Sequence, residues 1–422
     1  MKKVLIIAYY FPPLGGSGVQ RTLKFVKYLP QFGWQPTVLT VGNTAYYAKD
    51  DSLLKEIESL NIRIIRTQST DPNSILHKKK DIVKMPNERT RRFLNFISDT
   101  FFIPDNKIGW KRHAVKAASE VLAKEKFDVI FATAPPATDF LIGVELKKRF
   151  KIPLVVDYRD SWLSYPFKFF PTPLHKYLHF RKEKLVLHKS DMITVTHRRV
   201  KEEILTRHRF LRHDDVVILP HGFDPEDLQV DNPGLLPHIE KMRITYSGMF
   251  YGTKTPVYFL QALAKVFKEN PQMRGRIEAC FAGLFRAEHI NLINQLGLQN
   301  SVNLLGYLEH KESVRYLLAS DVVWVMMQDD WETPGKIFEY IGTKKKILGC
   351  VPKGYIRSII EEAGGDCVEP TDVNAIAAKI VELYQLYEKN QLKGARPEIA
   401  EKYNRMKLTN ELTKIFSKFL EV

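Results

Sequence analysis

A glycine-rich loop near the amino terminus is the first segment whose residue types could bind a ligand. Gly15, Gly16 and Gly18 stand between an apolar run at residues 4–8 and a stretch with apolar residues at helical spacing. Glycines let backbone amides come close to a phosphate or a sugar at the amino terminus of a helix. The pattern predicts such a binding loop, and a loop that only turns a strand into a helix is the alternative.

This loop fits a nicotinamide dinucleotide poorly. The dinucleotide fingerprint requires a third glycine three residues after Gly18, where Arg21 stands. It also requires an acidic residue at the end of the second strand, whereas residues 39–41 are Leu, Thr and Val. We therefore do not expect a dinucleotide-dependent oxidoreductase.

The densest group of polar residues lies in the second half of the chain. Pro334, Lys336, Glu339 and Tyr340 have the spacing Pro-x-Lys-x-x-Glu-Tyr, and a short loop then leads into an apolar run at residues 346–348. This pattern resembles the donor-site element of the large retaining glycosyltransferase family 4, whose members have two Rossmann-like domains in the arrangement called GT-B. The resemblance extends over nearly the whole chain.

The resemblance implies an enzyme that moves a sugar, with retention, from a nucleotide-diphosphate donor to a glycan or lipid-linked glycan acceptor in cell-surface polysaccharide synthesis. It implies that Glu339 accepts hydrogen bonds from ribose hydroxyls, which suits a carboxylate at the start of a helix. Gly248 and Lys254 match the family residues that hold the diphosphate. The residues expected to bind the donor are Gly15, Gly16, Ser247, Gly248, Lys254, Glu332, Pro334, Lys336 and Glu339.

The chemistry of the leaving group supports a role for Lys254. Breaking the anomeric bond leaves a nucleoside diphosphate, and its growing negative charge needs fixed positive partners. Thr255 and Pro256 are expected as the N-cap and first residue of a helix, whose positive end would point at the same phosphates. A solvated lysine, and for Glu339 an ordinary glutamate on a helix face, are the alternatives.

The sequence departs from the family pattern at two places. Many relatives carry a sugar-contacting glutamate eight residues before the one matched by Glu339. Trp331 stands at that position, flanked by Asp330 and Glu332, and one of these two acids could substitute.

The second departure lies at residues 157–162, where many relatives place a histidine near the reacting sugar. Arg159 and Asp160 are the candidate catalytic residues here, because an acid can receive the acceptor's proton or stabilise a cationic sugar. A structural Asp–Arg pair is the alternative. The GT-B type generally needs no metal, and no Asp-x-Asp motif follows a predicted strand, so we expect neither a metal nor another cofactor.

Both halves of the chain alternate short apolar runs with helical patterns. This alternation is typical of parallel sheets covered by helices on both faces. We predict an α/β fold of the GT-B type, with two doubly wound Rossmann-like domains facing each other across a cleft. Strands are expected near residues 4–8, 37–41, 62–65, 129–132, 154–157, 192–195 and 216–219, and again near residues 244–247, 277–282, 302–304, 322–326 and 346–348.

The domain boundaries follow from this alternation and from a Pro- and Gly-containing stretch between the halves. Residues 1–224 are the expected acceptor-side domain, and residues 225–241 are the linker. Residues 242–406 are the expected nucleotide-sugar-binding domain, and residues 407–422 form a helix expected to pack across the domain junction.

The net charge of +16 is confined to the first half of the chain. Residues 1–225 hold 39 Lys and Arg against 23 Asp and Glu, whereas the remainder holds 25 of each. Basic and aromatic residues are mixed at residues 76–112 and 165–184, which suits an anionic membrane or single-stranded nucleic acid. Solvated lysines around core phenylalanines are the third possibility.

The resemblance favours the membrane, because many family members glycosylate lipid-linked acceptors. With no apolar run near the ~18 residues of a spanning helix, we expect a cytoplasmic protein attached peripherally to the inner face of the cell membrane, with no nucleic-acid partner. The alternatives are a nucleotide-sugar epimerase of the same fold, or a non-catalytic membrane- or polyanion-binding module, for which the replacement at Trp331 is the best argument.

Overall fold

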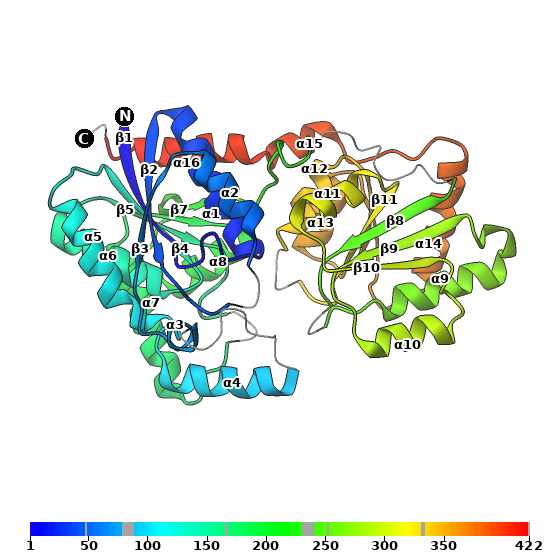
Figure 1. Cartoon of the computed structure of the whole chain (residues 1–422), viewed down its shortest axis with the longest axis horizontal. Coiled ribbons are helices and arrows are strands. Elements are labelled where there is room, and N and C mark those ends of the chain that lie inside the picture. The colour runs from blue at the N-terminus through cyan, green and yellow to red at the C-terminus, as the bar shows by residue number, and fades with distance from the viewer. Residues whose placement is uncertain are drawn as a thin grey trace. The chain divides into compact units, whose positions relative to one another are not determined.

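The computed structural model of the chain divides into two compact units (Figure 1). Unit 1 comprises Met1–His221 and Met406–Val422, and unit 2 comprises Gly222–Arg405. Each unit contains one parallel sheet with helices on both faces, which confirms the predicted pair of Rossmann-like folds. The structure describes residues 1–420 apart from 47–48, 78–87, 165–167, 230–239, 251–252 and 331–333.

The sheet of unit 1 has seven parallel strands in the order β3-β2-β1-β4-β5-β6-β7. Because the chain order reverses between β1 and β4, the loops that follow these two strands meet at the carboxyl edge, where open α/β sheets bind ligands. The strands are β1 (Lys2–Ile7), β2 (Trp34–Val41), β3 (Arg63–Thr67), β4 (Val129–Ala134), β5 (Leu154–Tyr158), β6 (Met192–Val195) and β7 (Val216–Ile218).

Two apolar layers cover the faces of this sheet, as the alternation of side chains along a strand requires. Leu5 and Ile7 pack into the layer that includes α5 and α6, whereas Val4 and Ile6 pack into the layer that includes α1 and α16. The helices of unit 1 are α1 (Ser17–Tyr28), α2 (Asp51–Ser59), α3 (Pro72–His77), α4 (Glu88–Phe101), α5 (Lys111–Leu122), α6 (Thr138–Phe150), α7 (Pro173–Lys189), α8 (Arg198–Arg207) and α16 (Arg405–Ser417).

Helix α16, drawn in red in Figure 1, completes the core of unit 1 although it lies at the end of the chain. Leu412 and Phe416 are fully buried, and the Phe416 ring lies 5.2 Å from the ring of Trp34 and 5.7 Å from that of Phe131. Unit 1 is therefore built from two segments that are far apart in the sequence.

The sheet of unit 2 has six parallel strands in the order β10-β9-β8-β11-β12-β13, and the chain order reverses between β8 and β11. Its strands are β8 (Met242–Ser247), β9 (Ile277–Ala282), β10 (Val302–Gly306), β11 (Val322–Met326), β12 (Lys346–Cys350) and β13 (Asp366–Val368). Its helices are α9 (Val257–Glu269), α10 (Ala287–Gln295), α11 (His310–Leu318), α12 (Lys336–Gly342), α13 (Tyr355–Glu362), α14 (Val373–Glu388) and α15 (Pro397–Lys402). Among the described residues, no helix is long and apolar enough to cross a membrane.

Candidate active site

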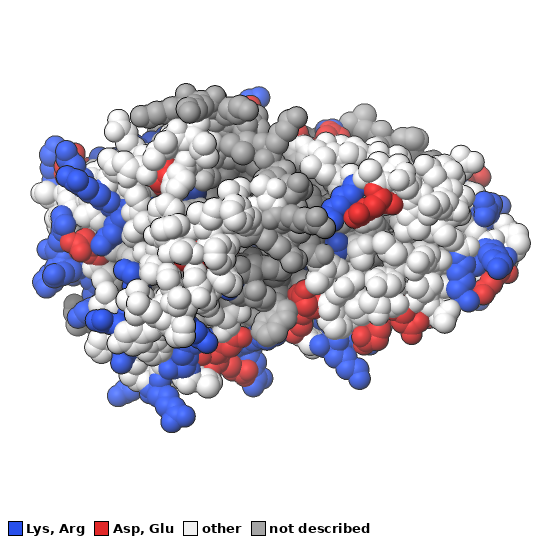
Figure 2. Space-filling model, turned by 90° about the horizontal axis from the view of Figure 1, so that it is seen from below, with Lys and Arg blue, Asp and Glu red and all other residues white. Residues whose placement is uncertain are grey.

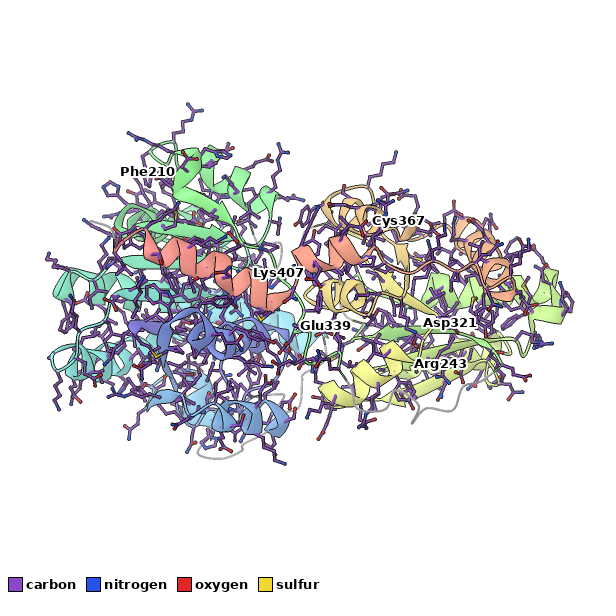
Figure 3. The ribbon with its side chains drawn as sticks, turned by 90° about the horizontal axis from the view of Figure 1, so that it is seen from above. Phe210, Arg243, Asp321, Glu339, Cys367 and Lys407 are labelled. Atoms are coloured by element: carbon purple, nitrogen blue, oxygen red, sulfur yellow. The ribbon has the colours of Figure 1, made fainter. Side chains whose placement is uncertain are left out.

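The polar residues of the predicted donor-site pattern gather at the carboxyl edge of the unit 2 sheet. Figure 3 shows Glu339 near this edge, whereas Arg243 at the start of β8 and Asp321 just before β11 lie at the opposite edge. Since β8 and β11 flank the switch point, the loops after them are where a Rossmann-like sheet binds its ligand. The fold thus places Glu339 where a ligand is expected.

Hydrogen bonds tie the beginning of α12 to the end of β8. The Lys336 ammonium donates to Ser247 Oγ at 2.5 Å, and Ser247 Oγ lies 2.6 Å from Ser313 Oγ on α11. The Tyr340 hydroxyl accepts a hydrogen bond from the Ser247 backbone N–H at 2.7 Å. Two residues of the predicted donor-site pattern, Lys336 and Tyr340, therefore contact the end of β8.

The Glu339 carboxylate has basic surroundings. Its Oε1 lies 3.1 Å from His310 Nε2, and the side chain is 18% exposed. Burial alone would raise the pKa of Glu339, but His310, Lys336 and Arg405 together hold it below its usual value. Glu339 is therefore an ionised acceptor at neutral pH, as binding of sugar hydroxyls requires.

Lys336 is the cation nearest to the end of β8 in this cluster. Burial lowers the pKa of its ammonium, and the charge of Glu339 opposes that shift. Its described hydrogen-bond partner is a serine hydroxyl, which carries no charge. An anionic ligand would therefore stabilise the charged form of Lys336.

The loop after β8 begins with a close approach between two backbones. The Gly248 N–H donates to the Ala282 carbonyl at 2.8 Å, and Gly283 has a φ of +149°. A Cβ added at Gly283 would lie 1.8 Å from the Gly248 carbonyl oxygen, so only glycine fits there. Lys254 lies further along the same loop and is partly exposed.

Helix α9 begins one residue later than predicted. It starts at Val257, so that Pro256 is its N-cap residue, and Thr255 Oγ1 still accepts a hydrogen bond from the Val257 N–H at 3.3 Å. The loop is also fastened to the one after β11, because Thr253 Oγ1 donates to Asp329 Oδ2 at 2.7 Å.

Asp330 and Glu332 are the two acids expected to substitute for the replaced family glutamate. Trp331 and Glu332 lie outside the described residues. The Asp330 carboxylate accepts hydrogen bonds from the backbone N–H groups of Tyr355 and Ile356 at 3.0 and 3.2 Å, and so caps the amino terminus of α13. Asp330 therefore has a structural task of its own.

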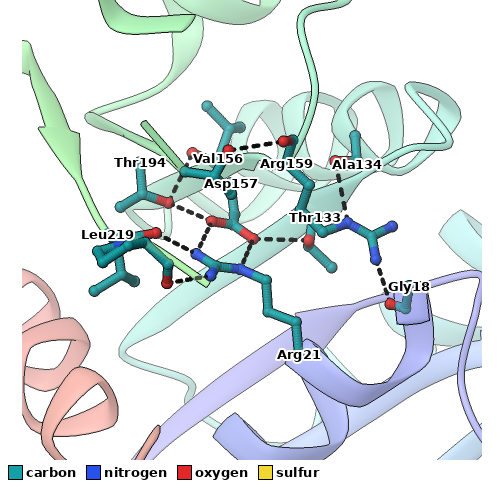
Figure 4. A network of polar contacts seen from close by, with 11 residues as sticks. Gly18, Arg21, Thr133, Ala134, Val156, Asp157, Arg159, Thr194 and Leu219 are labelled. Atoms are coloured by element: carbon teal, nitrogen blue, oxygen red, sulfur yellow. Dashed lines mark hydrogen bonds and ion pairs between the residues drawn. The ribbon is translucent and has the colours of Figure 1, made fainter. Parts of the chain in front are cut away.

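In unit 1, the structure places the candidate catalytic residue Arg159 beside the glycine-rich loop (Figure 4). Gly16 has a φ of +98° directly before α1, a conformation that favours glycine. The Arg159 guanidinium is 6% exposed and donates to the backbone carbonyls of Gly18, Ala134 and Pro135. Asp160, the next residue, is partly exposed.

A second buried polar group at the carboxyl edge of unit 1 has no motif in the sequence. Asp139 Oδ2 accepts from the Tyr9 N–H at 2.9 Å, and the Tyr9 hydroxyl donates to Asp71 Oδ2 at 2.9 Å. Burial raises the pKa of Asp139 well above its usual value, although the hydrogen bond from the Tyr9 N–H opposes that shift. These residues fix the chain that leaves β1.

Sequence reasoning also missed the partners of Glu339 and Ser247 in unit 2. His310 and Ser313 lie on α11, and Arg405 lies near the end of unit 2. The only signal in the sequence is the position of α11 after a predicted strand, since no short spacing links these residues to Pro334–Tyr340.

A metal site would need several ligand side chains close together. Among the described residues of each unit taken by itself, no three His, Cys, Asp or Glu side chains bring ligand atoms together. The expectation that no metal is needed stays a prediction.

Sequence comparison identifies the family of the chain. Residues 16–227 match the family model described as Glycosyltransferase Family 4, and residues 236–395 match the model described as Glycosyl transferases group 1. The chain belongs to glycosyltransferase family 4. It is therefore a glycosyltransferase that uses a nucleotide-sugar donor, which confirms the predicted enzyme class over an epimerase or a non-catalytic module.

Solved structures agree on the GT-B fold of this family 4 glycosyltransferase. HepE from Anabaena, in complex with UDP and glucose, is 15% identical with a TM-score of 0.67, and the match covers 99% of this chain and 100% of HepE. A glycosyltransferase from Rickettsia africae is 16% identical with a TM-score of 0.65, covering 99% and 98%. Sucrose-phosphate synthase from Thermosynechococcus elongatus is 15% identical with a TM-score of 0.63, covering 100% of both chains. No curated protein matches the sequence significantly.

Proposed function

We propose that this glycosyltransferase moves a sugar, with retention at the anomeric carbon, onto a glycan or lipid-linked glycan during cell-surface polysaccharide synthesis. The observation that carries the donor side of the proposal is the cluster at the end of β8, where Lys336 and Tyr340 both contact Ser247 beside the ionised Glu339. The acceptor side rests on family membership and on the basic, partly apolar surface of unit 1.

Each polar residue of the cluster has a proposed role in holding the donor. The Glu339 carboxylate accepts hydrogen bonds from the ribose hydroxyls, and His310 keeps it ionised and oriented. The backbone at Gly248 and the Lys254 ammonium hold the diphosphate, with Lys336 as a second cation. Pro334, whose carbonyl accepts a hydrogen bond from the Ile337 N–H at 3.1 Å, shapes the first turn of α12.

The same cations would serve the chemical step. As the bond between the anomeric carbon and the diphosphate oxygen breaks, negative charge grows on the departing diphosphate. Lys254 and Lys336 are fixed positive groups for that charge, which lowers the barrier most when they are already in place before reaction. Asp160 is the proposed acid near the sugar, and Arg159 supports it.

The test is a calorimetric titration of the full chain with nucleoside diphosphates and their sugars, followed by a transfer assay in excess EDTA. We expect one base and one sugar to bind, and turnover to persist with the chelator. No binding by any nucleotide sugar would overturn the donor proposal, and a rate that vanishes with EDTA and returns with magnesium or manganese would overturn metal independence.

We further propose that unit 1 attaches the enzyme to an anionic membrane surface. Helix α4 exposes a set of apolar side chains, and Figure 2, which views the molecule from below, shows a largely uncharged surface on unit 1 bordered by Lys and Arg. The Phe96 ring lies 5.0 Å from that of Phe169, so α4 and the segment before α7 form one surface. The exposed apolar residues of α4 are Phe93, Leu94, Phe96, Ile97 and Phe101.

An amphipathic helix with basic neighbours suits the interface of an anionic bilayer, where apolar side chains insert and cations approach the headgroups. The basic segment lies largely outside the described residues, since these exclude Lys78, Lys79, Lys80 and Lys84. The described side chains also exclude those of Arg89, Arg91 and Arg92. The proposal therefore rests structurally on the apolar face of α4.

Co-sedimentation with vesicles tests the membrane proposal. Phe101→Glu, at a side chain that is 76% exposed, should reduce binding to anionic vesicles, and binding of the unaltered protein should weaken as salt rises. The matched control is Leu284→Glu on unit 2, where the side chain is 57% exposed. Equal loss in both variants, or tighter binding to single-stranded RNA than to vesicles, would overturn the proposal.

A further inference from the structure

Arg159 connects three segments at the carboxyl edge of unit 1 through backbone carbonyls and one threonine hydroxyl. Its guanidinium donates to the carbonyls of Ala134, the last residue of β4, and of Pro135, and to that of Gly18 in the first turn of α1. The Thr196 hydroxyl after β6 donates to the Arg159 carbonyl at 2.8 Å. These segments surround the switch point of the sheet, where ligands of such folds bind.

A second buried arginine fastens the same helix from the other side (Figure 4). Arg21 makes a bidentate ion pair with Asp157, at 3.0 Å from Nε and 2.8 Å from Nη2, and donates to the carbonyls of Leu219 and Pro220. Both side chains of the pair are essentially unexposed, at 1% and 0%. Arg21 therefore connects α1 to the last residues of unit 1 before the chain enters unit 2.

The carboxylate of Asp157 is fully used within the protein. The Thr133 and Thr194 hydroxyls donate to it at 2.9 and 2.8 Å, in addition to Arg21. Burial alone would raise the pKa of Asp157, but the charge and hydrogen bonds of Arg21 hold it below its usual value. The pair is ionised, and no part of it is left for a substrate.

Gly18 shows how closely Arg159 is fitted to the glycine-rich loop. A Cβ added at Gly18 would lie 3.2 Å from Arg159 Nη1, which is tighter than ordinary contact. A larger residue at position 18 would therefore displace the guanidinium or the loop by a few tenths of an ångström.

We propose that Arg159, together with the Arg21–Asp157 pair, is a positioning residue for sugar transfer and does not touch the reacting atoms. Arg159 holds the Gly15–Gly18 loop and the backbone that carries Asp160 in one fixed arrangement. A displacement of about 1 Å in such a group can lower turnover roughly a hundredfold. The inference rests on the proposed function, because it assigns the glycine-rich loop and Asp160 to the transfer site.

Two substitutions act on this contact from its two sides. Arg159→Lys removes the planar guanidinium. The single ammonium of a lysine can reach only one of the three carbonyls that Arg159 contacts. Gly18→Ala leaves Arg159 in place and crowds it. We expect each to lower kcat by about 10- to 100-fold and to leave the affinity of unit 2 for a nucleoside diphosphate within about twofold, since the substitutions lie in unit 1.

The double variant separates positioning from direct catalysis. If both substitutions act through one contact, their losses in kcat do not multiply, because residues in contact are not additive. If Arg159 itself touches the reacting atoms, Gly18→Ala leaves kcat nearly unchanged while Arg159→Lys abolishes it, and the inference is overturned. Arg149→Lys is the matched control, because Arg149 forms an exposed pair with Glu145 on α6.

Turnover of the unaltered protein is measured first, as release of nucleoside diphosphate from the nucleotide sugar. Absence of any turnover there refutes the proposed function, and the positioning role with it. If the unaltered protein turns over and both variants are folded with unchanged kcat, the positioning role is refuted. The proposed function is not affected by that result. Lower melting temperatures without a change in kcat also refute the positioning role, because they show that Arg159 serves stability only.

Discussion

The carboxyl edges of the two sheets use charged side chains in opposite ways. In unit 1, Arg21, Asp157 and Arg159 are buried and bonded to groups of the same unit. In unit 2, Glu339 Oε1 lies 3.1 Å from His310 Nε2, and these two side chains are 18% and 14% exposed. The difference teaches that unit 1 uses buried charges to fix its loops, whereas the charges of unit 2 keep partial contact with solvent at the edge of the sheet.

The largest effect is expected when the charge of Asp157 in unit 1 is removed. Asp157→Asn leaves Arg21 buried without its counter-charge, and breaking a buried pair in this way costs about 3–5 kcal/mol. We expect a loss of stability of this order in chemical denaturation, with little direct effect on nucleotide affinity in unit 2. Glu145→Gln, on the exposed pair with Arg149, should change stability by less than about 1 kcal/mol. Similar losses in both variants would break the comparison.

The matching substitution in unit 2 should have the reverse signature. Glu339→Gln keeps the shape of the side chain but weakens its hydrogen bonds to ribose hydroxyls, with an expected loss of about 1.5–3 kcal/mol in donor binding. Calorimetry measures the affinity and a thermal scan measures the stability. Glu361→Gln, which alters an exposed pair with Arg357, is the control. If Glu339→Gln greatly lowers stability and leaves the affinity for the donor unchanged, Glu339 stabilises the fold as Asp157 does and does not bind the donor.

Lys254→Ala should give a smaller effect of the same kind. Lys254 is partly exposed, so water screens its charge, and we expect a loss of about 1.5 kcal/mol, at the lower end for charged hydrogen bonds. The loss should shrink as salt is added. A titration in which salt leaves the difference between Lys254→Ala and the unaltered protein unchanged would argue against a phosphate contact.

The smallest effect is expected from mild acid. Asp157 has a folded pKa below its usual value, so its contribution to stability is complete above about pH 4, its unfolded pKa. That contribution is lost only as the pH falls further, through the folded pKa. The stability difference between the unaltered protein and Asp157→Asn should therefore be constant from about pH 7 to about pH 5. A difference that disappears in that interval would contradict an ionised, buried pair.

The strands could be predicted from the sequence because both sheets are parallel and covered on both faces, which makes continuous apolar runs. The strand β13 could not, since Asp366–Val368 is only three residues long and holds one acid. The segment of helix α4 is interpreted from the sequence only as a mixture of basic and aromatic residues, although Phe93, Phe96, Ile97 and Phe101 recur at helical spacing.

The contacts of Lys336 and Tyr340 with the end of β8 could be anticipated from the sequence, because both residues belong to the local spacing at Pro334–Tyr340. The contacts of His310, Ser313 and Arg21 could not, since each joins side chains that are 29 to 136 residues from their partners. The position of Arg159 beside the glycine-rich loop depends on the strand order, which no short motif encodes. Its fork of backbone contacts likewise has no counterpart in the spacing of residues along the sequence.

Because α16 belongs to unit 1 but ends the sequence, it affects the order in which the two units can fold during synthesis. A ribosome finishes every residue of unit 2 before it reaches Leu412 and Phe416, which fill the layer beside Trp34 and Phe131. Unit 2 is continuous and can fold during synthesis, whereas unit 1 must wait with part of its apolar layer uncovered. The nascent first half is therefore the part of the chain most in need of a chaperone.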